Sequence, residues 1–447
     1  MNQDLTKGKI TSSLLLFAFP MMIGNLLQQF YNITDTLIVG QFIGKEALAA
    51  VGASYALMTF LTSIMIGLCM GSGVHFSVCF GGQDSEALKA GIFHAFSLIF
   101  LITALLTAAV FCLIDPIMAF LNTPEEIWNI MKKYLLIIFS GIPAVFLYNF
   151  FTALLRAVGN SAVPLIFLGI SAAINIALDL LFVVVLPFSI GGAAAATVIA
   201  QFIAAVGITG YTLIRFPEFR ISRRHMKWQH SILKEISRYS ILTCLQQSVM
   251  NFGILLVQGL VNSFGPTVMA AFAAAVKIDS FAYMPVQDFG NAFSTFAAQN
   301  YGAGKQERIR KGIRSAAFVT SVFSLTVSAA VCLFAAPLMR IFVKAEETEI
   351  IIVGTEYLRI EGSFYILIGI LFLLYGFYRA VGRPSMSLVL TVISLGTRVL
   401  LAYLLSAIPA ISVTGIWASV PIGWFLADAA GILYYLIRKG RLLPQVK

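Results

Sequence analysis

Residues 20–40 read PMMIGNLLQQFYNITDTLIVG, a largely apolar stretch with a single carboxylate, Asp35. It belongs to an apolar segment that opens near Ser12, long enough to cross a bilayer at about 1.5 Å per residue. At roughly 100° per residue, Gln28, Asn32 and Asp35 fall within an arc of about 60°, so the helix has one narrow polar stripe. A carboxylate inside a membrane normally faces a bundle interior, a cavity or an ion path. The stretch therefore predicts a membrane helix with a functional polar face, and a structural polar contact between helices is the alternative.

The composition of the whole chain is that of an integral membrane protein. Hydrophobic residues make up 59% of the 447 residues and charged residues 11%, and the mean hydropathy is +0.90, outside the range of soluble domains. The net charge of +10 is explained by basic loops that set the orientation in the membrane, so no nucleic-acid partner is expected. The five cysteines stand singly in apolar segments, which indicates neither a disulfide framework nor a metal site.

Hydrophobic runs separated by charged or Gly/Pro-rich punctuation predict twelve spanning helices. If the N-terminus is cytoplasmic, 22 of the 30 basic residues fall on the cytoplasmic side, which predicts that both termini are inside. The expected spans are 12–40, 47–78, 90–114, 130–155, 162–186, 192–214, 236–263, 268–298, 313–336, 351–378, 385–407 and 413–437.

The chain also repeats itself at an offset of about 220 residues. The motif Arg156-Ala157-Val158-Gly159 recurs as Arg379-Ala380-Val381-Gly382, and Tyr134 matches Tyr357. Six crossings return the chain to its starting side, so the copies are parallel repeats. We therefore expect an all-α integral membrane protein with twelve transmembrane helices in two six-helix lobes, related by a pseudo-two-fold axis along the membrane normal. The expected divisions are lobes at 1–214 and 236–437, a basic cytoplasmic linker at 215–235 and a cytoplasmic tail at 438–447.

A second polar stripe lies in the fifth predicted helix, where Asn175 and Asp179 stand at i and i+4. Counting residues from the helix ends places Asp179 at a similar depth to Asp35, and Thr197 of the sixth helix at the same level. Two carboxylates with amide and hydroxyl neighbours can share a proton or jointly bind a small cation. These residues are the candidate cation or proton site, with chance alignment of two buried acids as the alternative.

The second repeat lacks this acid pair. Gly253 stands opposite Asp35, and Arg398 stands opposite Asn175. The second half instead holds Glu361 and Arg398 at matching depth, which predicts that the two pair with each other. For Asp279 we expect a structural role. Candidates for a substrate cavity are Gln28, Asn32, Tyr148, Asn149, Gln246, Glu361 and Arg398.

Enzyme activity has little support in the sequence. There is no GxxxxGK[ST] loop for nucleotide phosphates, and no Ser/His/Asp or metal-ligand spacing. We therefore expect a secondary transporter and not an enzyme.

Pro20 can bend the first predicted helix.

At these residues the chain resembles the multidrug and toxic compound extrusion (MATE) family over essentially its full length. The resemblance rests on Pro20 with Asp35 fifteen residues on, INIALD around Asn175 and Asp179, GGAAAATVIAQ around Thr197, LLRAVGN at 154–160 and QNYGAG at 299–304. It implies cation-coupled export of amphipathic, mostly cationic compounds. It also implies that Asp35, Asn175, Asp179 and Thr197 line a proton or sodium site and that the first helix bends at Pro20.

A flippase for lipid-linked sugars is the competing function. A flippase is expected to need a cationic cavity for pyrophosphate, whereas the acid pair suits cations. A channel is disfavoured because no repeated filter motif is present. We expect a monomer in a bacterial plasma membrane with amphipathic small molecules and the lipid bilayer as partners, and no cofactor besides H⁺ or Na⁺ as the coupling ion, with Na⁺ held at Asp35 and Asp179.

Overall fold

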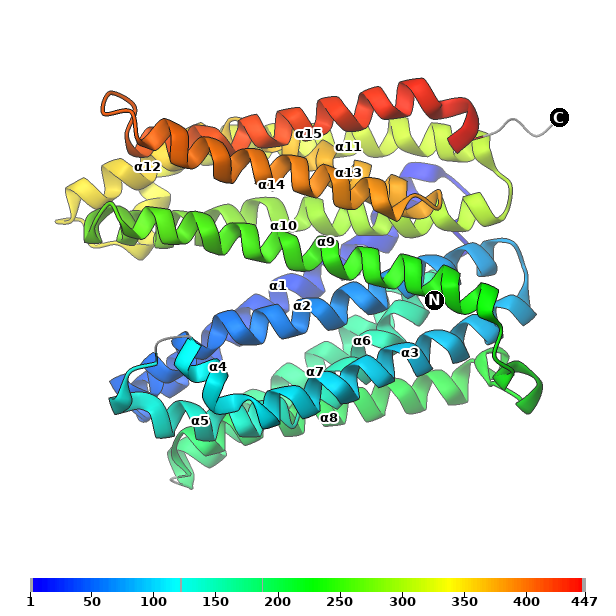
Figure 1. The fold of residues 1–447 in the computed structure, drawn as a ribbon, viewed down its shortest axis with the longest axis horizontal. Coiled ribbons are helices and arrows are strands. Elements are labelled where there is room, and N and C mark those ends of the chain that lie inside the picture. Colours follow the sequence, from blue (N-terminus) through cyan, green and yellow to red (C-terminus); the bar gives the residue numbers. More distant parts are fainter. Residues whose placement is uncertain (1–2, 121–122, 187, 444–447) are drawn as a thin grey trace. The chain divides into compact units, whose positions relative to one another are not determined.

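The computed structural model describes residues 3–120, 123–186 and 188–443, and within these ranges all regular structure is helical (Figure 1). Short helical turns η1 (Leu180–Val185), η2 (Pro217–Phe219) and η3 (Arg223–Met226) stand among the longer helices. The α-helices are α1 (Ile10–Phe42), α2 (Lys45–Gly81), α3 (Ser85–Cys112), α4 (Ile114–Phe120), α5 (Glu125–Phe139), α6 (Ile142–Ala157), α7 (Ala162–Asp179), α8 (Ser189–Arg215), α9 (His230–Asn262), α10 (Pro266–Gly302), α11 (Gln306–Phe342), α12 (Thr348–Gly362), α13 (Tyr365–Ala380), α14 (Pro384–Ser406) and α15 (Val413–Leu442).

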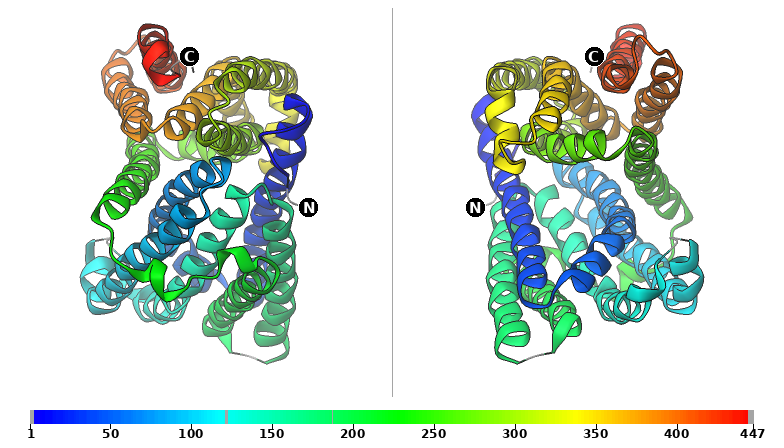
Figure 2. Two further views of the ribbon diagram at one scale, coloured as in Figure 1. Left: turned by 90° about the vertical axis from the view of Figure 1, so that its right-hand side faces the viewer. Right: turned by 90° about the vertical axis from the view of Figure 1, so that its left-hand side faces the viewer.

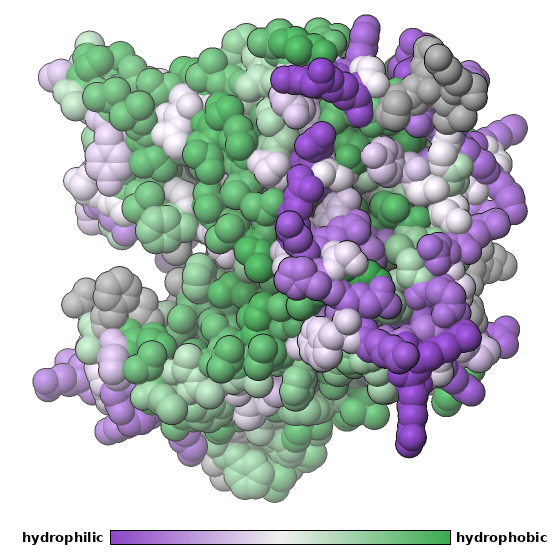
Figure 3. Space-filling model, turned by 45° about the vertical axis from the view of Figure 1, so that its right-hand side comes forward, coloured by the Kyte–Doolittle hydropathy of each residue, from purple (hydrophilic) through white to green (hydrophobic). Residues whose placement is uncertain are grey.

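The twelve predicted spans are confirmed, although two of them are broken. In the described residues, ten helices are long and apolar enough to cross a membrane, and two bent helix pairs bring the number to twelve. The pair α5–α6 bends by 41° and the pair α12–α13 by 51°. Pro143 opens α6 and Gly362-Ser363 ends α12, and these are residue types that interrupt a helix. Figure 3 shows green, apolar side chains over much of the face in view, and purple, hydrophilic ones gathered toward its right-hand side.

The internal repeat is visible in the backbone. Helices α5 and α6 begin at residues 125 and 142, and α12 and α13 begin at residues 348 and 365, so both starting points recur after 223 residues. Left-handed backbone recurs at the same turns, with φ of 121° at Gly44 and 95° at Gly265, and of 55° at Ser189 and 51° at Ser412. A serine at positive φ is uncommon, so its recurrence reflects a shared turn geometry.

The chain forms two compact units whose boundaries differ from the predicted lobes. The first unit holds Phe19–Phe80 and Asp84–Cys244, and the second holds Asp4–Ala18, Gly81–Gln83 and Leu245–Lys447. Within each unit the helices run roughly parallel as a bundle (Figure 2). The division thus falls inside α9 and not in the linker. The predicted tail is also partly helical, since α15 continues to Leu442, while residues 444–447 lie outside the described residues.

The first part of α9 belongs to the first unit because it packs tightly on α2. A Cβ atom placed on Gly67 would lie 2.5 Å from the Cα of Cys244, and one on Gly71 would lie 2.6 Å from the Cα of Ser240. The hydroxyl groups of Ser72 and Ser240 are 2.7 Å apart across the same contact. Small residues let two membrane helices approach closely enough for such hydrogen bonds.

The linker between the two repeats is bound to the N-terminal half of α3. His225 is buried, and its Nε2 lies 3.0 Å from Glu86 Oε2. Arg224 donates to the other oxygen of Glu86 at 2.7 Å. The backbone N–H of Gln229 donates to His94 Nε2 at 2.9 Å, while His94 Nδ1 lies 2.7 Å from the carbonyl of Ala90. The linker is therefore a docked segment with its own polar contacts.

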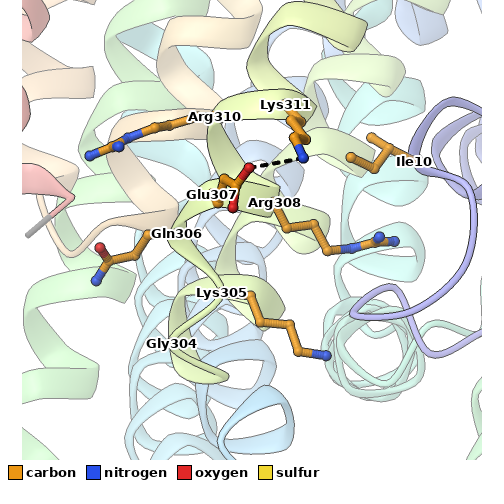
Figure 4. A pocket seen from close by; sticks show the side chains of 8 residues that line it. All are labelled: Ile10, Gly304, Lys305, Gln306, Glu307, Arg308, Arg310 and Lys311. Carbon is orange, nitrogen blue, oxygen red and sulfur yellow. Dashed lines mark ion pairs between the residues drawn. The ribbon is translucent and has the colours of Figure 1, made fainter. Parts of the chain in front are cut away.

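The segment Asp4–Gly8 belongs to the second unit because the turn between α10 and α11 binds it. Leu5 is fully buried and its N–H donates to Gln299 Oε1 at 3.1 Å. Arg308 donates to the carbonyl oxygens of Leu5 and Gly8, and Lys305 donates to that of Thr6 at 2.9 Å. Figure 4 shows Lys305 and Arg308 extending together on one side of a hollow of about 640 Å³ at the start of α11. The cations of this turn thus serve to hold the N-terminal segment.

Candidate functional site

The predicted cation-site residues meet within the first compact unit. Asp35 lies on α1, Asn175 and Asp179 on α7, and Thr197 on α8. Asn175 Nδ2 donates to Thr197 Oγ1 at 3.2 Å, and Thr197 Oγ1 donates to the carbonyl of Ala193. Asn175, Asp179 and Thr197 are buried, and Asp35 is half-buried. Residues from three helices therefore form one polar cluster in an apolar surrounding, as depth counting along the sequence predicted.

The carboxyl groups of Asp35 and Asp179 lie within electrostatic reach of each other. Among the described residues, no hydrogen-bond donor satisfies Oδ1 of Asp35 or either carboxyl oxygen of Asp179, and Oδ1 of Asn175 is also without one. Two like charges in a buried site repel each other, and each has lost its hydration. A proton shared between the acids, or one small cation bound by these oxygens, would remove both costs.

Two tyrosines complete the cluster and were missed in the sequence. Tyr31 of α1 interacts with Asp35 and its hydroxyl lies toward Thr197, and Tyr134 of α5 lies within electrostatic reach of both acids. The signal for Tyr31 was present, because Tyr31 and Asp35 stand at i and i+4 on one helix face. Tyr134 was noted only as a match to Tyr357, and its approach to α1 requires the fold.

A change of helix type follows the acid on α7. Asp179 is the last α-helical residue of α7, and the chain continues as the π-helical turn η1 from Leu180 to Val185. A π-helical turn carries weaker backbone hydrogen bonding and is often found at functional sites. Asp179 thus lies where the α-helix changes to a π-helical turn and not in the middle of a regular helix.

The other predicted cavity residues have varied surroundings. Gln28 is exposed and Asn32 half-buried, whereas Gln246 is buried with no partner for its Oε1 among the described residues. The hydroxyl of Tyr148 donates to the carbonyl of Pro164 at 2.9 Å, and Asn149 Nδ2 donates to the carbonyl of Val145 at 2.8 Å. The last two side chains are thus engaged in contacts within the first unit.

Pro20 lies inside one continuous helix. Helix α1 continues without a break from Ile10 to Phe42. The division between the compact units falls between Ala18 and Phe19, one residue before the proline. The predicted bend site therefore coincides with the point at which α1 passes from one unit to the other.

A second polar cluster lies in the second unit, and it corrects the predicted pair of Glu361 and Arg398. Glu361 does interact electrostatically with Arg398, but no ion pair within 4.0 Å joins these two described residues. Asp279, expected to be structural, interacts with both of them, and its carboxyl lies toward the hydroxyl of Tyr365. Glu361 lies toward the hydroxyl of Tyr357, one helical turn earlier. Arg398 therefore faces two acids and not one.

Comparisons with known proteins agree with this geometry. The family model MatE matches residues 20–181 and 241–404, which are the two repeats. The chain is 32% identical to the probable multidrug resistance protein YpnP of Bacillus subtilis over 98% of this chain and 97% of that one. It is 27% identical to the FAD transporter of Shewanella oneidensis over 97% of this chain and 96% of that one.

A solved structure, described as MATE in complex with MaL6, has the same fold. It superposes with a TM-score of 0.92 at 23% identity, covering 99% of both chains. The family model, the full-length relative and the helical fold lead to one conclusion. This chain is a multi-pass membrane transporter that belongs to the MATE family.

Proposed function

We propose that the chain is a cation-coupled antiporter that exports amphipathic, mostly cationic compounds from a bacterial cell. The observation that carries this proposal is the carboxyl pair of the half-buried Asp35 and the buried Asp179, in which Oδ1 of Asp35 and both oxygens of Asp179 lack hydrogen-bond donors in the described chain. Such a pair attracts either a positively charged substrate or a coupling cation. The two ligands then compete for one site, which is what exchange transport needs.

The mechanism follows from this competition. A proton or a sodium ion that enters from outside neutralises the pair, and a cationic substrate loses its electrostatic partner and leaves. Release of the cation to the inside restores the negative charge, and a new substrate binds. A ligand shifts a conformational equilibrium only through its differential affinity for the two states. The charge of the pair supplies that difference, and a change in α1 at Pro20 offers a way to transmit it.

The names of relatives support export of several compounds and leave the substrate open. YpnP is described as a probable multidrug resistance protein, while another relative is described as an FAD transporter. FAD is anionic, and a flippase substrate with a pyrophosphate is anionic as well. An acid pair repels both, so we favour cationic substrates.

The membrane placement belongs to the same proposal. We propose a monomer in the plasma membrane with both termini in the cytoplasm, because the basic residues gather in the segments that would lie there.

Transport by the purified chain in proteoliposomes tests the function. A fluorescent lipophilic cation is loaded, and proton and sodium gradients are imposed in separate experiments. We expect exchange driven by one of the two gradients, and loss of that exchange in Asp35→Asn. Asp115→Asn is the matched control, because Asp115 is paired with Lys132 outside the cluster. FAD uptake that is insensitive to the lipophilic cation, or drug exchange that persists in Asp35→Asn, would contradict the proposal.

A further inference from the structure

A further buried carboxyl group, that of Asp428, lies in the interior of the second compact unit. Asp428 of α15 is 3% exposed, and neither of its carboxyl oxygens has a hydrogen-bond or ion-pair partner among the described residues. Helix α15 packs against α12, α13 and α14. An ionisable side chain inside a membrane helix is a candidate for a proton or ion path.

The surroundings of Asp428 are polar but lack a direct counter-ion. Tyr375 of α13 is buried and lies within electrostatic reach of both Asp428 and Arg379. Arg379 donates to Asn291 of α10 at 3.0 Å. The hydroxyl of Tyr375 lies toward Thr391 of α14. The guanidinium of Arg379 is therefore bound to α10, and the hydroxyl of Tyr375, which lies within electrostatic reach of Asp428, is neutral.

Other titratable groups on α12, α13 and α14 have partners of their own or approach α15 at other residues. The hydroxyl of Tyr378 on α13 donates to the carbonyl of Gly431 at 2.6 Å. Arg398 of α14 approaches α15 at Gly423 and belongs to the cluster with Asp279. Glu356 of α12 accepts from Thr414 at 2.6 Å. None of these contacts supplies a positive charge to the carboxyl group of Asp428.

A carboxylate without donors is costly to bury, whereas a protonated carboxyl is neutral and can donate a hydrogen bond. We propose that Asp428 is a second proton-binding site of the transporter, which exchanges its proton separately from the Asp35–Asp179 pair. The step is a proton transfer alone: the carboxyl O–H bond breaks, the carboxylate remains, and the proton passes to solvent. Ser387 and Thr391 of α14 are both fully buried, and the hydroxyl of Ser387 donates to the carbonyl of Tyr375 at 3.0 Å.

Infrared difference spectroscopy on the full-length protein in lipid nanodiscs tests this site. Spectra recorded at mildly acidic and alkaline pH show the C=O band of protonated carboxyl groups that deprotonate between the two. We expect the intensity of this band in Asp428→Asn to be lower than in the unchanged protein by the contribution of one carboxyl group. In Asp428→Glu the contribution of this carboxyl group to the band should shift in frequency and not disappear. This variant keeps the test valid if the asparagine variant does not fold. Asp115→Asn is the control that should leave the band intact.

The same measurement separates this proposal from the proposed function. Asp35→Asn combined with Asp179→Asn should remove a different component and leave that of Asp428. If the Asp428 contribution is lost in Asp428→Asn while the pair contributes none, proton coupling through the pair fails and this site stands. A titrating band that is identical in Asp428→Asn, Asp428→Glu and the unchanged protein would overturn the site.

Discussion

The hydrogen bond from Asn175 to Thr197 fixes the side of α7 on which Asp179 meets Asp35. Each acid alone would be a costly charge in an apolar surrounding, and under the proposed function the two together would hold one exchangeable cation between them. The charge of the pair therefore belongs to both residues, and neither can be replaced without changing the other.

Asp35→Asn and Asp179→Asn should each abolish gradient-driven efflux while leaving membrane expression intact. An amide is nearly isosteric with a carboxyl group and is cheaper to bury than a charge. Since the two acids act as a unit, the double variant should be no worse than either single one. Efflux in cells and expression by immunoblot are the measurements, and full efflux by Asp35→Asn at normal expression would refute the mechanism.

In the second cluster Arg398 faces both Asp279 and Glu361. Removing the arginine should therefore lower stability more than removing one of the acids. Arg398→Gln leaves two acids without a cation and should destabilise the protein by about 3–5 kcal/mol, the usual cost of an uncompensated buried charge. Glu361→Gln leaves Arg398 with Asp279 and should cost less, and it should partly rescue Arg398→Gln when combined with it. Thermal unfolding in detergent measures this, with exposed Arg340→Gln as the control. A double variant that is less stable than Arg398→Gln alone would contradict the cluster.

At the scale of helices, the contact of α2 with α9 depends on glycines. Gly71→Ala should lower stability by about 1–3 kcal/mol, as overpacking does, because the added Cβ meets the backbone of Tyr239 and Ser240, which cannot move aside. Gly52→Ala lies on the same helix with nothing within 4 Å, and it should stabilise by up to about 1 kcal/mol through helix propensity. The two melting temperatures should shift in opposite directions, and equal shifts would argue against the close contact.

The docked linker makes a second prediction at this scale. His94→Ala removes the acceptor for the N–H of Gln229 and should loosen the segment before α9. Trypsin should then cut faster at the exposed basic residues Arg223, Arg224 and Lys227. His230→Ala, an exposed histidine at the start of α9, should leave the cleavage rate unchanged. If His94→Ala is cut no faster than His230→Ala, the histidine does not hold the linker.

These elements also show what the sequence could and could not predict. Hydropathy predicted where the spans lie, and counting residues from the helix ends predicted that Asp35 and Asp179 lie at the same depth. Both predictions use only properties of a single helix. The attachment of Asp4–Ala18 to the second unit depends on Arg308 reaching the backbone of Leu5, which leaves no periodic pattern. The approach of Tyr134 to the two acids and that of Asp279 to Arg398 were not predicted for the same reason, since these partners lie on other helices and depth alone does not show how a helix is rotated.

For the whole molecule, the distribution of basic residues predicts a definite topology. In a chain lacking its five cysteines, a new cysteine at Lys227 should be labelled only from the cytoplasmic side, and one at Glu126 only from outside. Both positions are exposed, so access is decided by the membrane alone. Labelling of intact cells with a membrane-impermeant maleimide is the measurement, and modification at position 227 without permeabilisation would reverse the topology.

The buried segment Asp4–Gly8 has a practical consequence for anyone who expresses this protein. Leu5 is fully enclosed, and the carbonyl oxygens around it are bound by Arg308 and Lys305. A purification tag or fluorescent fusion that replaces these residues would leave two cations without their acceptors and expose the turn before α11. Affinity handles therefore belong after Leu443, and an amino-terminal fusion should keep Asp4–Gly8 intact behind a flexible spacer.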